Sequence, residues 1–438
     1  MKTVNIITYE IKKNIFWWLY YAFMMLVLVS WSNHEVAPSE AYRYIYMVLF
    51  ALPFFFDRHN NFLSFFFLFY TVGLYGIGFS YLPNRTMPYA LILIALTIKN
   101  KRLSIKLSGW NRILILGFLI VIVDFFGLFG MESSDIISDR RIWPVSIVCL
   151  LPLFLSADKN RDADKLSFSF IFISLILSLQ FILLGSTVAV SYDYASGVDR
   201  VAWMDPNYFA PIVGVGLLMS VLTLLEKENG LLMKILLIST IVISAVTIIL
   251  SASRGAVLAV AISLAIIISM SKANTYYKIF MIVAGAILII LLYNSGFFEL
   301  LEYRLSDASN LSSGAGRYDI WSKKLDSFID NGNILSIFFG VGYNAAFRLG
   351  FREGMGFHND FLAFLCSYGF VGLILFLIVL LWPVFMTKKE NRTHVLPFTV
   401  FLLVVGTTVE PLCNLYMPYW FLLFYIYVKV FQYKNITK

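Results

Sequence analysis

The chain has 438 residues and a formal net charge of +8; 60% of its residues are apolar and only 14% are charged. A soluble domain carries about 25% charged residues, so this composition excludes an ordinary water-soluble fold. The basic residues lie in short segments between apolar runs, which indicates a membrane protein and excludes nucleic acid as the partner of the positive charge.

Apolar runs that could cross the bilayer follow one another along the whole chain. The first, Ile15 to Trp31, comes after Lys12 and Lys13 and has no small-residue cleavage site behind it, so we predict a retained span rather than a signal peptide. Several runs fall short of the roughly 20 residues of an upright helix, so we expect about 12 to 14 spans. The candidates are 15–32, 41–56, 62–82, 86–98, 113–130, 142–156, 166–187, 207–225, 235–251, 255–270, 279–294, 358–386, 396–410 and 416–430. The sequence therefore predicts an all-α, polytopic transmembrane protein whose residues 1–438 form one integral membrane domain.

The basic residues also predict an orientation. With the N-terminus inside, most lysines and arginines fall in cytoplasmic segments, and both termini are cytoplasmic. The short outer loops then keep only Arg43, Arg85, Arg140, Arg141, Arg200 and Arg254. The longest connection, residues 295–357, is mostly polar and is expected as a large outer loop. Within it, apolar residues at helical spacing predict an amphipathic helix from Arg317 to Ile329, and the glycine-rich stretch from Gly340 to Gly356 predicts irregular structure.

Three short motifs at the outer ends of spans could carry chemistry. In the first, Arg200 precedes Asp205, Pro206 and Asn207, and the Asp-Pro pair predicts a helix start. These residues are also compatible with a well-made helix start and a surface arginine, without further function.

The second motif is Ser253-Arg254-Gly255, a turn between two apolar runs. An arginine at this depth costs free energy unless it reaches a partner, a ligand or lipid phosphate, so snorkelling to the headgroups is the simple alternative to a site. The three cysteines add no further motif. Cys149 and Cys366 lie in apolar runs and Cys413 in a short loop, which predicts neither disulfides nor a metal site.

The third motif is His358-Asn359, followed after nine residues by Gly369 and Gly372. A histidine is largely neutral near pH 7 and can accept a proton, although it could also be a plain interfacial polar group. The two glycines are three residues apart, so we expect them on one helix face, where they would allow close packing against a neighbour.

The spans that begin near 207, 255 and 358 all run from outside to inside. If their N-termini converge, the free N–H groups and the positive ends of the helix dipoles form a site for an anion, completed by Arg200 and Arg254. A diphosphate is the anion we expect, because arginine matches phosphate geometry.

These motifs, together with Gly316-Arg317 in the long loop, resemble the O-antigen ligase and surface-polysaccharide polymerase superfamily of bacterial membrane glycosyltransferases over residues 200–385. The resemblance implies a metal-independent enzyme without cofactor that uses undecaprenyl diphosphate-linked oligosaccharides at the outer face of the bacterial cytoplasmic membrane. It implies that Arg254 and Arg200 stabilise the leaving diphosphate and that His358 is the general base. Further candidates are Arg317, Arg348, Asn359, Asp205 and Asn207 for substrate binding, and Asp319 or Glu410 as weaker alternatives for the base.

Several functions remain open at this point. The ligase pattern often has threonine after the second glycine, where this chain has Leu373, so we prefer a polymerase to a ligase that acts on lipid A core. A secondary transporter would be expected to carry ionisable residues inside its spans, and Asp124 is almost the only one. A flippase for lipid-linked oligosaccharides would need basic residues open to both sides. Whether a chain-length regulator binds is left open; membrane lipids are expected partners.

Overall fold

The computed structural model describes residues 161–184, 190–193, 198–201, 206–227, 229–306, 314, 316–330, 332–342, 345–351 and 356–409, together with residues 19, 20 and 23. Of the first six candidate spans, only residues 19, 20 and 23 are described. The last candidate span lies outside the described residues, as do Asp205 and Glu410. The rest of the fold is described from the remaining part of the chain.

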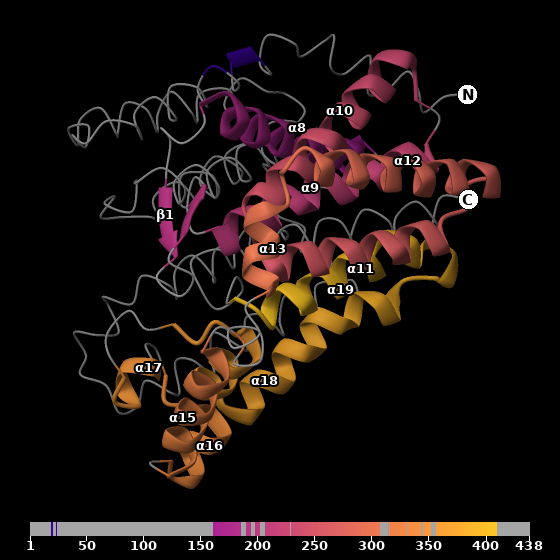
Figure 1. The fold of residues 1–438 in the computed structure, drawn as a ribbon. Coiled ribbons are helices and arrows are strands. Elements are labelled where there is room, and N and C mark those ends of the chain that lie inside the picture. The colour runs from indigo at the N-terminus through magenta and orange to yellow at the C-terminus, as the bar shows by residue number, and fades with distance from the viewer. Residues whose placement is uncertain are drawn as a thin grey trace.

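Seven apolar helices form the body of the described structure (Figure 1). They are α8 (Arg161–Leu184), α9 (Pro206–Glu226), α10 (Leu231–Leu250), α11 (Arg254–Met270), α12 (Thr275–Asn294), α18 (Asp360–Met386) and α19 (Leu396–Gly406). Among the described residues, four helical stretches are long and apolar enough to cross a membrane: Pro206–Glu226, Leu231–Leu250, Thr275–Asn294 and Asp360–Ile378. The predicted all-α, polytopic membrane protein is therefore confirmed.

Helix α9 is the centre of this bundle. It packs against α8, α10 and α11, and almost every residue along it is buried. A Cβ on Gly216 would lie only 2.1 Å from Ser174 Cβ, so glycine allows α8 to approach closely. The Ser174 hydroxyl in turn donates to the Val213 carbonyl at 2.8 Å and shares a 2.9 Å hydrogen bond with Ser244 on α10. A helix that is apolar all round and buried in this way holds its neighbours together.

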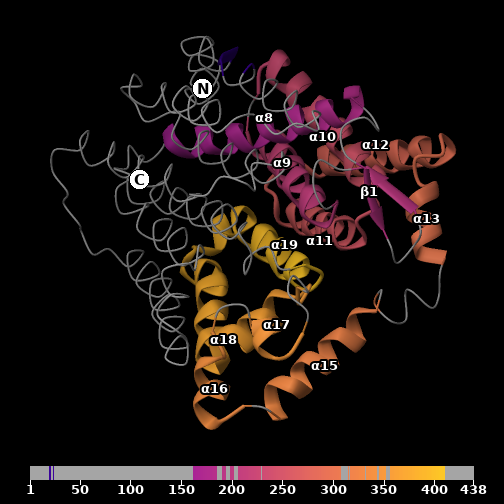
Figure 2. The same cartoon turned by 90° about the vertical axis from the view of Figure 1, so that its left-hand side faces the viewer.

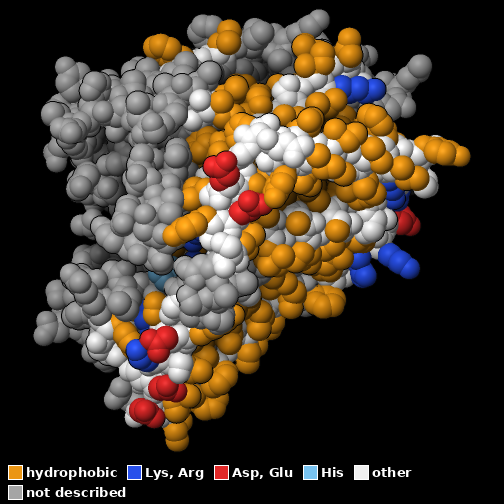
Figure 3. Space-filling view, in the orientation of Figure 1, with side chains coloured by type: hydrophobic (Ala, Val, Ile, Leu, Met, Phe, Trp, Pro, Cys, Tyr) orange, Lys and Arg blue, Asp and Glu red, His pale blue; other side chains and the backbone are white. Residues whose placement is uncertain are grey.

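Helix α12 has the opposite environment, because only one of its residues, Leu292, is buried. Its large apolar side chains are exposed along the helix, among them Phe280, Ile282 and Ile290. On the face in Figure 3, apolar side chains form a broad surface over α11, α12 and α18, and charged side chains lie towards its edges. Such a surface is unfavourable in water and matches the hydrocarbon of a bilayer.

A short β-hairpin precedes α9 and was not predicted from the sequence. Strands β1 (Val190–Asp193) and β2 (Val198–Val201) pair antiparallel, with Ser191 opposite Arg200. The hairpin lies on the same side of the bundle as α13 (Figures 1 and 2).

The long connection, residues 295–357, contains four helices in its described part. These are α13 (Glu299–Ser306), α15 (Arg317–Asp330), α16 (Ile334–Phe339) and the single turn α17 (Ala345–Arg348). The predicted amphipathic helix from Arg317 to Ile329 is confirmed as α15. The stretch predicted as irregular, from Gly340 to Gly356, has positive φ angles at Gly340, Gly342 and Gly350, but it also contains α17.

The connection and α18 share a small apolar core. Phe328 of α15, Leu349 after α17 and Phe357 pack together with Ala363 and Cys366 of α18. The start of α18 is therefore held by the connection as well as by α19, against which it also packs.

Helix α18 is broken at Gly369, whose φ of 68° and ψ of −170° are not helical. The break frees two carbonyls, and the connection supplies their donors: Val341 N–H donates to Cys366 at 2.9 Å and Gly342 N–H to Ser367 at 3.0 Å. A Cβ on Gly369 would lie 2.3 Å from the Phe338 carbonyl carbon and oxygen, so only glycine fits here.

This geometry corrects the prediction that Gly369 and Gly372 together form one packing face of a continuous helix. Gly369 does meet a neighbour, but it does so by interrupting the helix. The nearest atoms to a Cβ on Gly372 belong to Tyr368 of the same helix, at 2.1 Å. The second glycine therefore accommodates the kink instead of a neighbouring helix.

Candidate functional site

Helices α9 and α11 begin side by side. The Ser253 hydroxyl, just before α11, donates to Asn207 Oδ1 in the first turn of α9 at 3.3 Å. Ser253 therefore makes no side-chain cap for α11, although serine is a favoured N-cap residue. The structure brings the second motif together with Asn207 of the first motif. Asp205 is outside the described residues, and Arg200 is placed by its backbone on β2, as partner of Ser191.

The turn before α11 is buried and conformationally unusual. Ala252 is fully buried and has a φ of 49°, a left-handed conformation that is rare for alanine. Such a residue costs of the order of 1–3 kcal/mol and persists only when its surroundings hold it in place. Ser251 helps to hold it, because its N–H donates to the Thr247 carbonyl and its hydroxyl to the Ile248 carbonyl.

Two arginines lock this turn to the long connection. Arg254 Nη1 donates to the carbonyl of Arg304, in the last turn of α13, at 3.2 Å. Arg304 is buried, and its Nη1 donates to the Ala252 carbonyl. A positive side chain at a helix C-terminus is favoured by the helix dipole, so α13 helps to orient Arg254. Arg304 was not selected from the sequence. Arg254 could be selected because it lies between two apolar runs. Arg304 lies in a polar segment, where an arginine is not conspicuous.

Gly255 lets the first turn of α11 approach the end of α19. A Cβ on Gly255 would lie 2.3 Å from Thr408 Oγ1, just beyond α19. Two residues back, a Cβ on Gly406 would lie 3.1 Å from Asp360 Oδ2, in the first turn of α18. The starts of α11 and α18 therefore both lie against the end of α19, and α9 joins them through Asn207. The arrangement of α11, α18 and α19 can be followed in Figure 2.

His358 and Asn359 form the entry to α18. His358 is half-buried and has a φ of 51°; it and Ala252 are the two non-glycine residues with positive φ in the described structure. Asn359 Oδ1 accepts a 3.1 Å hydrogen bond from Leu362 N–H, as an N-cap side chain does. Asn359 thus has a capping role, beside the substrate-binding role expected from the sequence.

Asp360, the next residue, is fully buried and was not predicted from the sequence as a site residue. The signal was present, since a carboxylate directly follows the histidine motif. An acidic residue in the first turn of a helix is common, and burial cannot be read from its type.

The arginines of the connection occupy two further positions. Arg317 is half-buried at the first position of α15, and its N–H donates to the Gly314 carbonyl at 3.4 Å. Arg348 is exposed on α17, where its Nη1 donates to the Val341 carbonyl at 2.8 Å. This contact ties α17 to the stretch that fills the break in α18, so Arg348 supports the connection.

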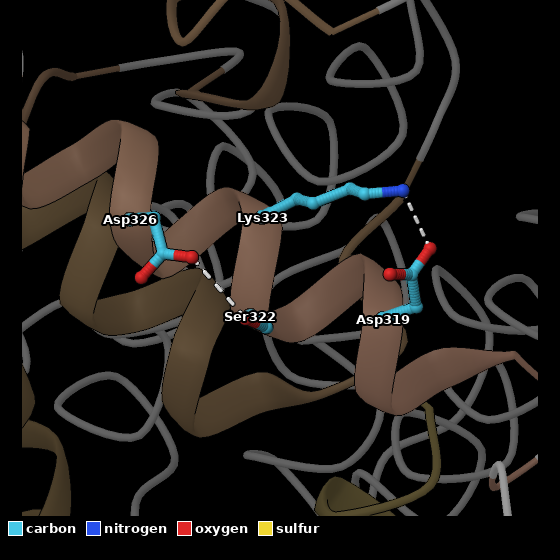
Figure 4. Close-up of polar contacts among 4 residues, drawn as sticks. All are labelled: Asp319, Ser322, Lys323 and Asp326. Carbon is cyan, nitrogen blue, oxygen red and sulfur yellow. Dashed lines mark hydrogen bonds and ion pairs between the residues drawn. The ribbon is translucent and has the colours of Figure 1, made fainter.

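Asp319, a weaker candidate for the base, lies on the outer face of α15. Its side chain is 69% exposed and pairs with Lys323 at 2.7 Å (Figure 4). One turn on, Ser322 donates to Asp326 at 3.2 Å on the same face. This is an ordinary solvated pair, which favours His358 over Asp319 as the base.

One comparison with known families bears on this site. Residues 239–377 match a family model described as O-antigen ligase. The matched segment runs from α10 to the kinked part of α18 and contains Arg254, Arg304 and His358. No curated protein matches the chain. The match covers less than half of the chain but includes the turn before α11, the long connection and the histidine motif, and it supports placing this membrane protein in the O-antigen ligase and polymerase superfamily.

Proposed function

We propose that the protein is a surface-polysaccharide polymerase. It joins oligosaccharide repeat units carried on undecaprenyl diphosphate at the outer face of the bacterial cytoplasmic membrane, with both termini in the cytoplasm. The observation that carries the proposal is the meeting of the starts of α9, α11 and α18 around the end of α19, with Arg254 and His358 at two of these starts. The family match over the same segment supports it.

The chemistry is a glycosyl transfer. A hydroxyl oxygen of one lipid-linked unit forms a bond to the anomeric carbon of the sugar on a second lipid carrier. The bond from that carbon to the phosphate oxygen breaks, and undecaprenyl diphosphate leaves with the bonding electrons. The proton of the attacking hydroxyl passes to the imidazole of His358, which acts as general base.

Negative charge grows on the leaving diphosphate, and the site offers positive groups to meet it. Arg254 supplies a guanidinium, and the first turn of α11 supplies N–H groups that the Ser253 side chain does not cap. In this proposal they take the place of a metal ion. Arg200 is the second positive group for the leaving diphosphate, and Arg317, Asp205 and Asn207 complete the substrate contacts, with Asn359 and Arg348 holding the framework around them.

A polymerase is preferred to a ligase because Leu373 stands where ligases often have threonine. A ligase would use the same donor and leaving group but transfer the glycan to lipid A core. The two therefore differ in the acceptor and share the site described above.

The test is polymerisation by purified protein in nanodiscs, supplied with a lipid-linked repeat unit from the same host, with and without chelator. We expect a ladder of longer lipid-linked glycans that survives chelator. Arg254→Ala should lower the rate about 100- to 1,000-fold through loss of charge stabilisation. His358→Ala should lower it about 100- to 10,000-fold through loss of the base.

Lys234→Ala is the matched control, because this exposed lysine lies in the first turn of α10 at the other end of the bundle. It should leave the rate unchanged. No ladder, but transfer once lipid A core is added, would identify a ligase. Silence with both acceptors would overturn the enzyme proposal in favour of a flippase or transporter.

A further inference from the structure

Lys324 is a charged residue in an unusual environment. It lies in the middle of α15, and its side chain is 0% exposed. Its Nζ donates to the Gly356 carbonyl at 2.6 Å and lies 4.3 Å from the ring centroid of Phe357 and 5.4 Å from that of Phe351. A backbone oxygen and two aromatic rings are thus among the close neighbours of the ammonium group.

The neighbouring lysine shows how costly this placement is. Lys323 extends from the outer face of the same helix, with 65% of its side chain exposed and a surface pair to Asp319 (Figure 4). Lysine is almost never fully buried, because removal of an ammonium from water costs free energy that its new partners must offset. A leucine or methionine would fill the same space without that cost, so the ammonium at residue 324 requires a reason.

The carbonyl that Lys324 binds belongs to the residue two before His358. One turn earlier on α15, Trp321 Nε1 donates to the carbonyl of Phe357, the residue directly before His358, at 2.8 Å. One turn later, the Ser327 hydroxyl donates to the Leu349 carbonyl at 2.8 Å. One face of α15 therefore binds the backbone that leads into the histidine motif.

We propose that Lys324 is a positioning residue for His358. Because Lys324 and Trp321 fix two consecutive carbonyls, the chain enters His358 in one orientation and is held in the left-handed conformation at that residue, from which Asn359 caps α18. The imidazole is thereby aimed from a rigid backbone. This inference rests on the proposed role of His358 as general base.

A similar arrangement exists at the other left-handed residue. Ala252 also lies two residues before a helix, α11, and a buried cation of the long connection, Arg304, binds its carbonyl. Both unusual helix entries are thus held by a positive side chain of the connection. This parallel favours a positioning role for Lys324 over accidental burial of a surface residue.

The test compares Lys324→Met with Lys323→Met in full-length protein in nanodiscs. Methionine keeps most of the apolar volume at residue 324 and removes the charge and the N–H donors. A displacement of about 1 Å at a reacting group can cost 100-fold, so we expect Lys324→Met to lower kcat about 100-fold with little change in KM. Lys323→Met should change neither constant.

Three further measurements separate positioning from folding. The melting temperature of Lys324→Met should fall no further than that of Arg304→Met, because each variant removes one charged donor from a backbone carbonyl. Amide hydrogen exchange should rise at residues 356–360 and stay unchanged in α9. Lys324→Arg, which keeps a cationic donor, should restore at least a tenth of the parent kcat.

The His358→Ala background completes the design. If Lys324 acts through His358, Lys324→Met should lower the residual rate of His358→Ala no further, because the two effects are not additive. Full activity of Lys324→Met beside an inactive His358→Ala would overturn the positioning role alone. Full activity of His358→Ala would instead overturn the role of His358 in the proposed function. A melting temperature well below that of Arg304→Met, or an equal further loss of rate in the double variant, would reduce Lys324 to a structural residue.

Discussion

The same helices form both ends of the bundle, yet the two ends are built differently. At one end, which we call the lysine end, α9 and α11 finish, α10 and α12 begin, and Lys227, Lys234, Lys272 and Lys278 lie in or beside the turns. At the other, the site end, α9, α11 and α18 begin and α19 finishes. The turns of the lysine end only connect helices, whereas those of the site end also place candidate catalytic side chains.

The lysine end is built from local structure that costs little free energy. Asn274 caps α12 by accepting from Tyr276 N–H at 3.0 Å, and Gly230 opens α10 with nothing within 4 Å of a Cβ added to it. Its main polar link is half-buried: Glu226 accepts from Lys272 N–H at 3.2 Å and lies 3.8 Å from His394. These features join helix ends without buried cations or left-handed residues.

The site end, in contrast, gathers features that cost free energy. Ala252 and His358 have positive φ, Arg304 and Lys324 are buried, and Gly255 meets Thr408 closely. Natural sequences depart from the rules of stable design mostly where function requires it. The difference between the ends therefore favours the site end as the place of function, and it does so independently of the family match.

The largest difference in stability should be between substitutions of two glycines at helix starts, one at each end of the bundle. Gly255→Ala would press a methyl group into Thr408 and should lower the free energy of unfolding by about 3 kcal/mol. Gly230→Ala should change it by less than about 0.5 kcal/mol, because the site is open. Denaturant titration in detergent micelles measures both. Thr408→Gly should restore most of the stability of Gly255→Ala, and equal effects of the two alanines would remove the contrast between the ends.

A smaller difference should separate two hydrogen bonds to backbone carbonyls. Arg304→Met leaves the buried Ala252 carbonyl without its charged donor and should cost about 2 kcal/mol, as expected for a hydrogen bond from a charged group. At the lysine end, Thr393→Val removes a neutral bond to the Met270 carbonyl and should cost about 1 kcal/mol. The same titration tests the order, and a larger loss for Thr393→Val would contradict it.

The smallest effect should come from the outer face of α15. Asp319→Asn removes an exposed pair with Lys323, which is worth less than about 0.5 kcal/mol and weakens with salt. Both unfolding and polymerisation should stay close to those of the parent. A strong loss of polymerisation in this variant would instead restore Asp319 as a candidate for the base.

Much of the helical framework could be predicted from the sequence, because long apolar runs and the Asp205-Pro206 start carry strong local signals. The amphipathic α15 was predicted within a residue at its end, since its apolar positions recur at helical spacing. The hairpin was missed because two four-residue strands are too short to show a pattern of alternation. The break at Gly369 was missed because a glycine in an apolar run fits a packed helix as well as a kinked one.

The candidate site was predicted in part. His358 and Arg254 are conspicuous because a polar residue at the end of an apolar run is unusual. The buried residues Arg304, Lys324 and Asp360 were not identified, because a charged residue in a polar segment looks the same whether it is buried or solvated. Lys323 and Lys324 are adjacent and chemically identical, and only the packing of α15 against Phe351, Gly356 and Phe357 distinguishes them.

The break in α18 also bears on how the protein is made. Residues 334–342 leave the ribosome before α18, and the N–H groups of Val341 and Gly342 find their acceptors at Cys366 and Ser367 only after that helix exists. A half-helix of nine residues spans about 13 Å and cannot cross the hydrocarbon alone. Unsatisfied carbonyls at the break would also be costly in lipid. Insertion of this span and closure of the connection are therefore expected to be one late, coupled step of biogenesis. A chain that stalls before Ser367 would leave both the start of α18 and the connection unassembled.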